Sequence, residues 1–283
     1  MKKQQVIVAV SGIIVLIIFY FFGNTVPPLK KSPTPGSATA SQSLDIKTIL
    51  DAGKAKLSEA SLAYVNRLEN SVVRGNVKNQ QIETDRQLAG FWKDSVENGF
   101  LASAYYTAEA AKLENSEKSL TFAAQLFLNN LRGQDNPALK NWMANQSRDL
   151  FERAEKLNPD NDSTKIGLGA TYIFGSNAEQ PADLMNGIQK ILEVSRRDSL
   201  NMYAQLMLGL GGIESGQYDK AIPRLLKVVH YDPGNLEAVL SLCEAYERTG
   251  NNASAKIWYI TAKKMTNNHE LIEAINERLG SLK

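Results

Sequence analysis

The residue types that most often carry out chemistry are scarce in this chain and lie far apart. There are two histidines, His230 and His269, and one cysteine, Cys243. Neither histidine has the spacing to Cys243 or to the other histidine that a zinc or similar metal site requires. We therefore interpret His230 as a residue beside a turn and His269 as the start of a helix. A single cysteine also excludes a disulfide within the chain.

The remaining motifs that suggest chemistry are incomplete. Asp160 and Asp162 resemble the start of a calcium-binding loop, but the further oxygen ligands and the closing glutamate are missing, so a turn between helices explains them better. The glycine-rich run Gly209–Gly212 does not follow a predicted strand, and no phosphate-binding loop of the form GxxxxGK[ST] occurs. The sequence therefore predicts no catalytic residue, no cofactor and no metal site. An enzyme stays open only if residues 44–130 hold an unfamiliar site.

The charge balance limits the class of partner. The chain carries 32 lysines and arginines against 30 aspartates and glutamates, which gives a net charge of +2. Proteins that bind nucleic acids usually carry a clear basic excess, because contacts to phosphate supply much of their affinity. We therefore expect no nucleic acid as the main partner.

The chain does contain a repeated pattern between residues 201 and 268. The same or similar residue types recur 34 residues apart, which marks a stack of repeated supersecondary units. The recurring pairs are Leu208 and Leu242, Gly216 and Gly250, Ala221 and Ala255, Leu225 and Tyr259, and Val228 and Ala262.

Each copy of the pattern predicts two helices joined by a tight turn. Ala221, Leu225 and Val228 are spaced i, i+4 and i+7, so they share one face of the second helix. The small Ala221 lets the two helices approach closely. Gly216 and its equivalent Gly250 suit the left-handed backbone conformation that often ends a first helix.

This pattern resembles the tetratricopeptide repeat, because the small and large residues and the closing proline, Pro233, fall where that family places them. The resemblance is strongest over residues 161–268 and weaker over 77–160, where we predict degenerate helix pairs. It implies an all-α fold, an α-solenoid in which helix hairpins stack into a right-handed superhelix. Cys243 then takes the position that Gly209 has in the preceding copy, which favours a packed small side chain over a reactive thiol.

Helical segments are predicted at both ends of the repeats. Residues 269–283 form a predicted capping helix, which a solenoid needs because its last repeat has no neighbour to cover it. Residues 44–76 form a predicted helical N-terminal cap that Gly53 divides, with a dimerising helix as the alternative. The turn around residues 178–183 is longer than the family pattern and is expected to form an exposed loop.

The N-terminal residues predict a membrane anchor. Residues 6–22 are apolar and uncharged, and a helix of this length reaches about 25 Å, near the lower limit for crossing a bilayer. We therefore expect residues 1–22 to form one transmembrane helix, in contact with the lipid bilayer through residues 6–22. A cleaved signal peptide is the alternative, although Ala38-Thr39-Ala40, a suitable cleavage sequence, lies far beyond the apolar run. Residues 23–43, rich in proline, serine and threonine, predict a flexible linker.

Two features bear on the orientation of this anchor. Lys2 and Lys3 precede the span and Lys30 and Lys31 follow it, so the count of flanking positive charges is tied. A short tail before a long folded part is typical of a signal anchor whose N-terminus stays inside. We therefore expect a single-pass protein of the bacterial inner membrane with a periplasmic C-terminal domain.

The resemblance implies a groove that binds a protein or peptide. In tetratricopeptide repeat stacks the first helices of successive hairpins line a concave surface, which holds extended peptides or helices. The residues expected to line it here are Tyr203, Leu206, Leu210, Ile213, Leu240, Glu244, Glu247 and Arg248. These side chains suit an apolar or mildly basic segment better than a C-terminal carboxylate. The alternative is that the neighbouring repeat or the 44–73 helix covers part of this apolar surface.

The sequence as a whole predicts a non-catalytic, membrane-anchored adaptor or scaffold for a protein partner of unknown identity. The anchor would raise the local concentration of the bound partner at the membrane. Residues 200–264 also resemble the repeats of membrane-anchored tetratricopeptide proteins of cytochrome c maturation, which implies an assembly factor that presents an apo-protein. A structural membrane protein that self-associates into a homo-oligomer is the remaining alternative.

Overall fold

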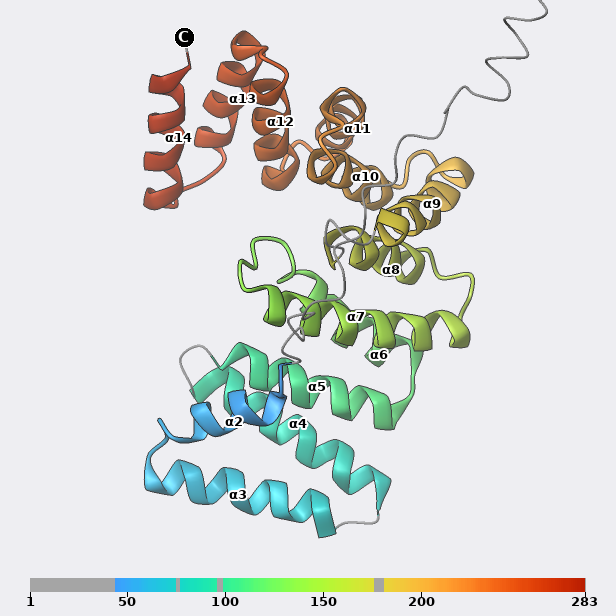
Figure 1. Cartoon of the computed structure of the whole chain (residues 1–283), viewed down its shortest axis with the longest axis vertical. Helices are drawn as coiled ribbons and strands as arrows, with labels where there is room; N and C mark the ends of the chain where they lie inside the picture. Colours follow the sequence, from blue (N-terminus) through green and yellow to red (C-terminus); the bar gives the residue numbers. More distant parts are fainter. Residues whose placement is uncertain (1–43, 75–76, 96–98, 176–180, 283) are drawn as a thin grey trace, which may run out of the picture. The chain divides into compact units, whose positions relative to one another are not determined.

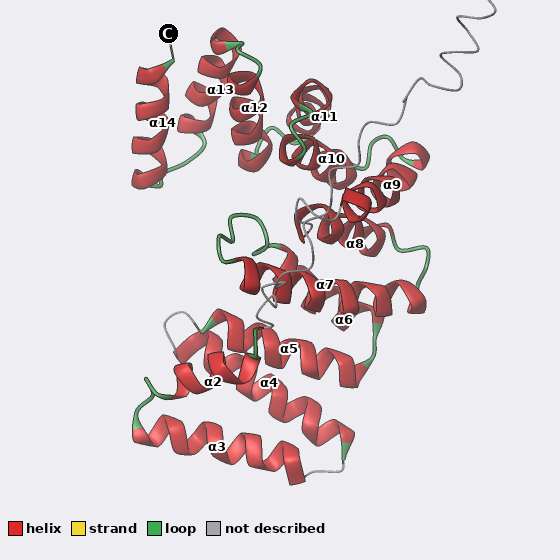
Figure 2. Cartoon of the chain, viewed as in Figure 1, coloured by secondary structure: helices red, strands yellow, loops and turns green. Residues whose placement is uncertain are grey.

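The described part of the chain is built from α-helices. The computed structural model describes residues 44–74, 77–95, 99–175 and 181–282. Within these ranges every regular element is a helix and no strand occurs (Figure 2). The all-α prediction is therefore confirmed for these residues. The predicted anchor, residues 1–22, and the predicted linker, residues 23–43, lie outside them. Among the helices that are described, none is both long and apolar enough to pass through a bilayer.

The helices follow one another with short connections (Figure 1). Their bounds are α2 Ile46–Lys54, α3 Glu59–Arg74, α4 Lys78–Ser95, α5 Phe100–Glu114, α6 Glu117–Leu128, α7 Pro137–Leu157, α8 Asp162–Gly175, α9 Pro181–Arg197, α10 Met202–Glu214, α11 Tyr218–Tyr231, α12 Leu236–Arg248, α13 Asn252–Lys264 and α14 His269–Ser281.

Helices adjacent in the sequence pair as hairpins, and successive hairpins pack on one another. The pairs are α4 with α5, α6 with α7, α8 with α9, α10 with α11, and α12 with α13. The first helices α6, α8, α10 and α12 also meet one another in succession. This order of contacts is the stack of hairpins that the repeat pattern predicts.

The 34-residue period appears directly in the helix bounds. The first helix α10 spans Met202–Glu214 and its equivalent α12 spans Leu236–Arg248, so both ends are shifted by 34 residues. Gly216 and Gly250 have φ angles of 70° and 76°, which confirms the left-handed conformation predicted after each first helix. Side-chain caps repeat as well, because Asn201 and Asn235 each accept a backbone N–H at the start of α10 and α12.

Small residues allow the two helices of a hairpin to pack closely. A β-carbon placed on Gly209 of α10 would lie 2.7 Å from Leu225 Cδ2 of α11. In the preceding hairpin, a β-carbon on Gly169 of α8 would lie 2.7 Å from the carbonyl oxygen of Gly187 in α9. Since no side chain fits at these distances, α8 and α9 approach backbone to backbone. The prediction that the small Ala221 permits a close approach is confirmed as well, since a β-carbon on Gly212 of α10 would lie 3.0 Å from Ala221 Cβ.

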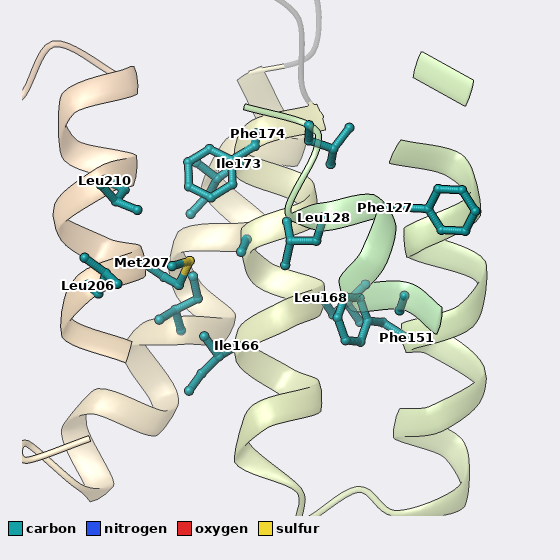
Figure 3. Close-up of a cluster of buried hydrophobic side chains, with 14 of the residues drawn as sticks. Phe127, Leu128, Phe151, Ile166, Leu168, Ile173, Phe174, Leu206, Met207 and Leu210 are labelled. Atoms are coloured by element: carbon teal, nitrogen blue, oxygen red, sulfur yellow. The ribbon is translucent and has the colours of Figure 1, made fainter. Parts of the chain in front are cut away.

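The buried side chains form three clusters. The central cluster runs from Ala104 in α5 to Ala245 in α12. Figure 3 shows part of it, where Leu206, Met207 and Leu210 of α10 project toward α8. An N-terminal cluster surrounds Trp92, and a C-terminal cluster includes Cys243 together with residues of α13 and α14. Two helices belong to two clusters each: α5 contributes to the N-terminal and central clusters, and α12 to the central and C-terminal clusters.

The two ends of the stack are closed by helices without a complete partner hairpin. The predicted division of the first segment is confirmed, since α2 ends at Lys54 and α3 begins at Glu59. A β-carbon on Gly53 would lie 2.9 Å from the ring of Trp92, so Gly53 lets α2 rest against that ring. At the other end, α14 places Ile275, which is 2% exposed, in the C-terminal cluster.

Candidate functional site

Two cavities lie along the first helices of the hairpins. The first, which we call the α4–α6 cavity, has a volume of about 610 Å³ and lies between α4, α5 and α6. The second, the α6–α12 cavity, has a volume of about 370 Å³ and is lined by α6, α8, α10 and α12. We refer to the two cavities together as the first-helix groove.

Helix α6 joins the two cavities. Phe122 lines the α4–α6 cavity, whereas Gln125 and Asn129 line the α6–α12 cavity. These residues are spaced i, i+3 and i+7, so they share one helical face. Both cavities therefore border the same face of α6.

The α4–α6 cavity is mostly apolar. Its floor contains Ala104 and Ala111, which are 1% and 2% exposed, and the space above Gly90 is open, since a β-carbon there would meet no atom within 4 Å. Phe122 stands at its edge with 60% of its surface exposed. On the rim the Arg86 guanidinium donates to the Glu114 carboxylate at 2.6 Å.

The α6–α12 cavity is smaller and more polar. Tyr203 Oη donates to Gln125 Oε1 at 3.3 Å, which links α10 to α6. Burial raises the pKa of the Tyr203 hydroxyl above its usual range, so this group stays a neutral donor. Arg132, just after α6, forms an ion pair with Glu237 of α12 and places its guanidinium carbon 5.4 Å from the centre of the Phe174 ring.

Four of the residues predicted to bind a partner lie on α10. Tyr203, Leu206 and Leu210 line the α6–α12 cavity. However, Leu206 is 8% exposed and Leu210 1% exposed, because α8 covers this face of α10. Ile213 is 8% exposed and lines neither cavity. The neighbouring repeat thus covers part of this apolar surface, which is the alternative given in the sequence analysis.

The other four predicted residues lie on α12 and do not gather with those of α10. Leu240 packs on the C-terminal cluster, and Glu244 and Arg248 are exposed. Glu247 points toward the second helix of its hairpin, where Tyr259 Oη donates to it at 2.9 Å and Arg278 of α14 lies at 3.4 Å. Whether these residues bind a partner stays a prediction.

Sequence reasoning missed Phe122, Arg132 and Glu237 as parts of the groove. The apolar residues of the 120–131 segment point to every side of the helix, so the pattern does not single out Phe122 as exposed. Arg132 and Glu237 are 105 residues apart, and no local signal connects them.

Residues that the sequence analysis considered for chemistry are buried or paired with other residues of the fold. Cys243 is fully buried, its Sγ lies 3.2 Å from the Val239 carbonyl oxygen, and burial raises its pKa to about 12. Asp162 pairs with Arg197, and Asn161 Nδ2 donates to Glu117 at 2.6 Å. Within the described ranges, no group of three or more histidine, cysteine, aspartate or glutamate side chains is arranged to hold a metal ion.

Comparison with known proteins bears on the C-terminal part of the chain. Residues 213–275 match the family model described as "Tetratricopeptide repeat". The search of curated proteins found no significant match. Among solved structures, the MamA protein is 16% identical over 66% of this chain and 92% of its own, with a TM-score of 0.43. YrrB, titled a TPR protein with an unusual peptide-binding site, is 14% identical over 74% of this chain and 97% of its own, also with a TM-score of 0.43. At these scores neither structure adds to the argument.

Proposed function

We propose that this chain, a tetratricopeptide repeat protein over residues 213–275, is a non-catalytic scaffold that binds a protein partner in the first-helix groove. The observation that carries the proposal is the α4–α6 cavity, an apolar hollow of about 610 Å³ with Phe122 exposed at its edge. A large aromatic ring beside an apolar cavity is typical of a surface that a partner covers.

The lining suggests what the partner presents. The apolar floor around Ala104 and Ala111 suits a large aliphatic or aromatic side chain from a helix or an extended segment. On the rim, Arg86 is neutralised by Glu114, whereas Lys93 forms no ion pair with a described residue. A partner segment with an acidic residue beside its apolar anchor therefore fits this cavity best.

We further propose that residues 1–22 hold the scaffold at a membrane as a single-pass anchor. The apolar run 6–22 and the proline-rich run 23–43 support this proposal. The C-terminal domain would then be periplasmic in a bacterial cell, with its partner gathered at the inner membrane.

The test is affinity capture from native membranes with the full chain, solubilised in mild detergent. The groove variant is Phe122→Glu. The matched control is Ile257→Glu, which places the same charge on α13, a second helix, at a side chain that is 63% exposed. We expect wild type and control to retain the same partner and Phe122→Glu to lose it, with all three showing equal helical circular dichroism. A partner retained equally by Phe122→Glu would overturn the groove proposal.

Two alternative functions were left open by the sequence, and further measurements on the same preparation distinguish them from the proposed scaffold. An assembly factor for cytochrome c would bind peptides that contain C-x-x-C-H, which titration of such peptides detects. A self-associating structural protein would sediment as an oligomer in detergent, whereas the scaffold proposed here would sediment as a monomer.

A further inference from the structure

A third cavity, separate from the first-helix groove, lies near the N-terminal end of the stack. It has a volume of about 550 Å³ and is lined by α2, α3, α4 and α5. Four carboxylates line it, contributed by Asp51, Glu69, Asp85 and Glu109. Tyr105 and Tyr106 of α5 also line it, with ring centres 5.2 Å apart.

Two of these carboxylates are already satisfied inside the protein. Glu69 accepts hydrogen bonds from the Lys54 ammonium and from Tyr106 Oη, both at 2.6 Å. Glu109 accepts from the Lys112 ammonium at 2.9 Å. Each of these two groups therefore has a donor that offsets the cost of taking it out of water.

Asp85 differs from both. Its side chain is 4% exposed, yet it forms no hydrogen bond or ion pair with any residue in the described part of the chain. A buried carboxylate is normally paired or hydrogen-bonded, because an isolated charge in a low-dielectric site is costly. The Asp85 carboxylate is therefore free to accept a hydrogen bond from a donor that enters the cavity.

The surroundings indicate the chemistry of that donor. As noted for the described residues, the carboxylates do not form a metal-binding group. Tyrosine rings have electron-rich faces, which attract organic cations. The remaining wall includes Leu50 and Leu88, which suit an aliphatic chain.

We propose that this cavity binds an organic cation, an ammonium or guanidinium group carried on an aliphatic chain, with Asp85 as its counter-ion. The same chemistry is found in a lysine or arginine side chain of a peptide and in a free diamine. The proposal does not depend on the first-helix groove, whose residues are different.

The charge state of Asp85 makes the affinity for the cation depend on pH. Burial, and then the neighbouring Glu109, raise the pKa of the Asp85 carboxyl to about 7. The other charged or titratable groups that line the cavity are Lys47, Asp51 and Lys54 from α2, Glu69 from α3, and Tyr105 and Tyr106 from α5. Because the cation needs the ionised acid, its affinity is expected to rise about tenfold between pH 6 and pH 8.

The experiment is isothermal titration calorimetry of the full chain in mild detergent. The probes are pentane-1,5-diamine, agmatine and a Gly-Lys-Gly peptide with blocked ends, and pentan-1-ol serves as the uncharged control. We expect at least one cationic probe to saturate at pH 8 and pentan-1-ol to give no binding. Binding of the peptide alone identifies a protein source, and binding of the diamine or agmatine alone identifies a small molecule.

The variant that tests the counter-ion is Asp85→Asn, with Asp149→Asn as the matched control on the exposed face of α7. We expect Asp85→Asn to weaken binding about tenfold or more and Asp149→Asn to leave it unchanged. Asp85→Asn should also raise the Tm of the unliganded protein, since it removes an unpaired buried acid, so lost binding cannot be ascribed to unfolding. No binding of any cation at pH 8, or equal binding by Asp85→Asn, overturns the proposal.

Discussion

Arg132 and Glu237 form an ion pair between residues that lie 105 positions apart in the sequence. The pair joins the turn after α6 to the first turn of α12, across the α6–α12 cavity. Both side chains are partly exposed, at 34% and 51%, so the contact is screened by solvent. The pair links residues that belong to different hairpins.

We expect Arg132→Ala to cost about 1 kcal/mol or less of stability and to loosen α12 locally. Urea unfolding measures the first effect, and amide hydrogen exchange of α12 measures the second. Arg153→Ala removes an ion pair that lies within α7 alone and should leave exchange in α12 unchanged. Unaltered α12 exchange in Arg132→Ala would show that the pair does not connect the hairpins.

Replacement of Gly169 tests the close approach of α8 and α9. A β-carbon there meets Ile191 at 2.6 Å and the Gly187 carbonyl oxygen at 2.7 Å, so Gly169→Ala should lower the free energy of unfolding by about 1–3 kcal/mol. Gly90→Ala provides the matched control, because its β-carbon enters open space and should stabilise α4 by about 0.5–1 kcal/mol. Chemical denaturation of both variants checks the opposite signs.

The left-handed turns of the two clear repeats give a second test of the backbone. Gly216 has φ 70°, a conformation that costs a β-carbon about 1–2 kcal/mol. We expect Gly216→Ala to lower stability by about that amount and Gly216→Asn to lower it less, since asparagine tolerates this region better. If alanine and asparagine were equally tolerated, the φ angle would not be the cause.

Cys243 should behave as a buried small residue. Its thiol is fully buried and its pKa is raised to about 12, so almost no thiolate exists at pH 8. We expect no reaction with a thiol reagent at pH 8 in the native protein and complete reaction in urea. Rapid native labelling would mean that the C-terminal cluster opens readily.

Asp85 predicts how the stability of the unliganded protein depends on pH. The pKa of Asp85 is about 7 in the folded state, whereas the ordinary pKa of an aspartate is 3.8. Between these two pH values the folded state therefore binds more protons than the unfolded state. The contribution of Asp85 to stability therefore falls as the pH rises from about 4 to 7. We expect wild type to lose more than about 1 kcal/mol relative to Asp85→Asn between pH 5 and pH 8, measured by urea unfolding. Parallel curves for the two proteins would contradict this.

The sequence predicts the helices well because the repeat imposes them. The recurrence of Gly216 as Gly250 and of Ala221 as Ala255 is enough to place α10 to α13, and the bounds follow the same period. The residues of the groove were predicted less well. The face of a helix can be recognised from its own sequence, whereas the exposure of that face depends on the neighbouring helix. Leu210 has the right spacing for a groove residue, yet α8 buries it.

The surfaces that the sequence did not predict depend on distant partners. From the sequence alone Glu247 is expected to be an exposed acid, but in the structure it contacts Tyr259 and Arg278. Asp85 lies in a polar stretch of α4 and gives no sign of burial, since α2 and α5 enclose it from other parts of the chain. Such residues can be recognised only after the hairpins are stacked.

Helices α5 and α12 each belong to two buried clusters, and this determines the order in which parts of the protein unfold. Ala102 and Tyr106 belong to the N-terminal cluster, whereas Ala104, Ala108 and Ala111 of the same helix belong to the central one. Fraying of α2 and α3 would therefore expose one side of α5 while the other side stays packed, as in sub-global opening. A protease acting on the native protein should release the end helices first and leave a resistant fragment that contains α5 and α12.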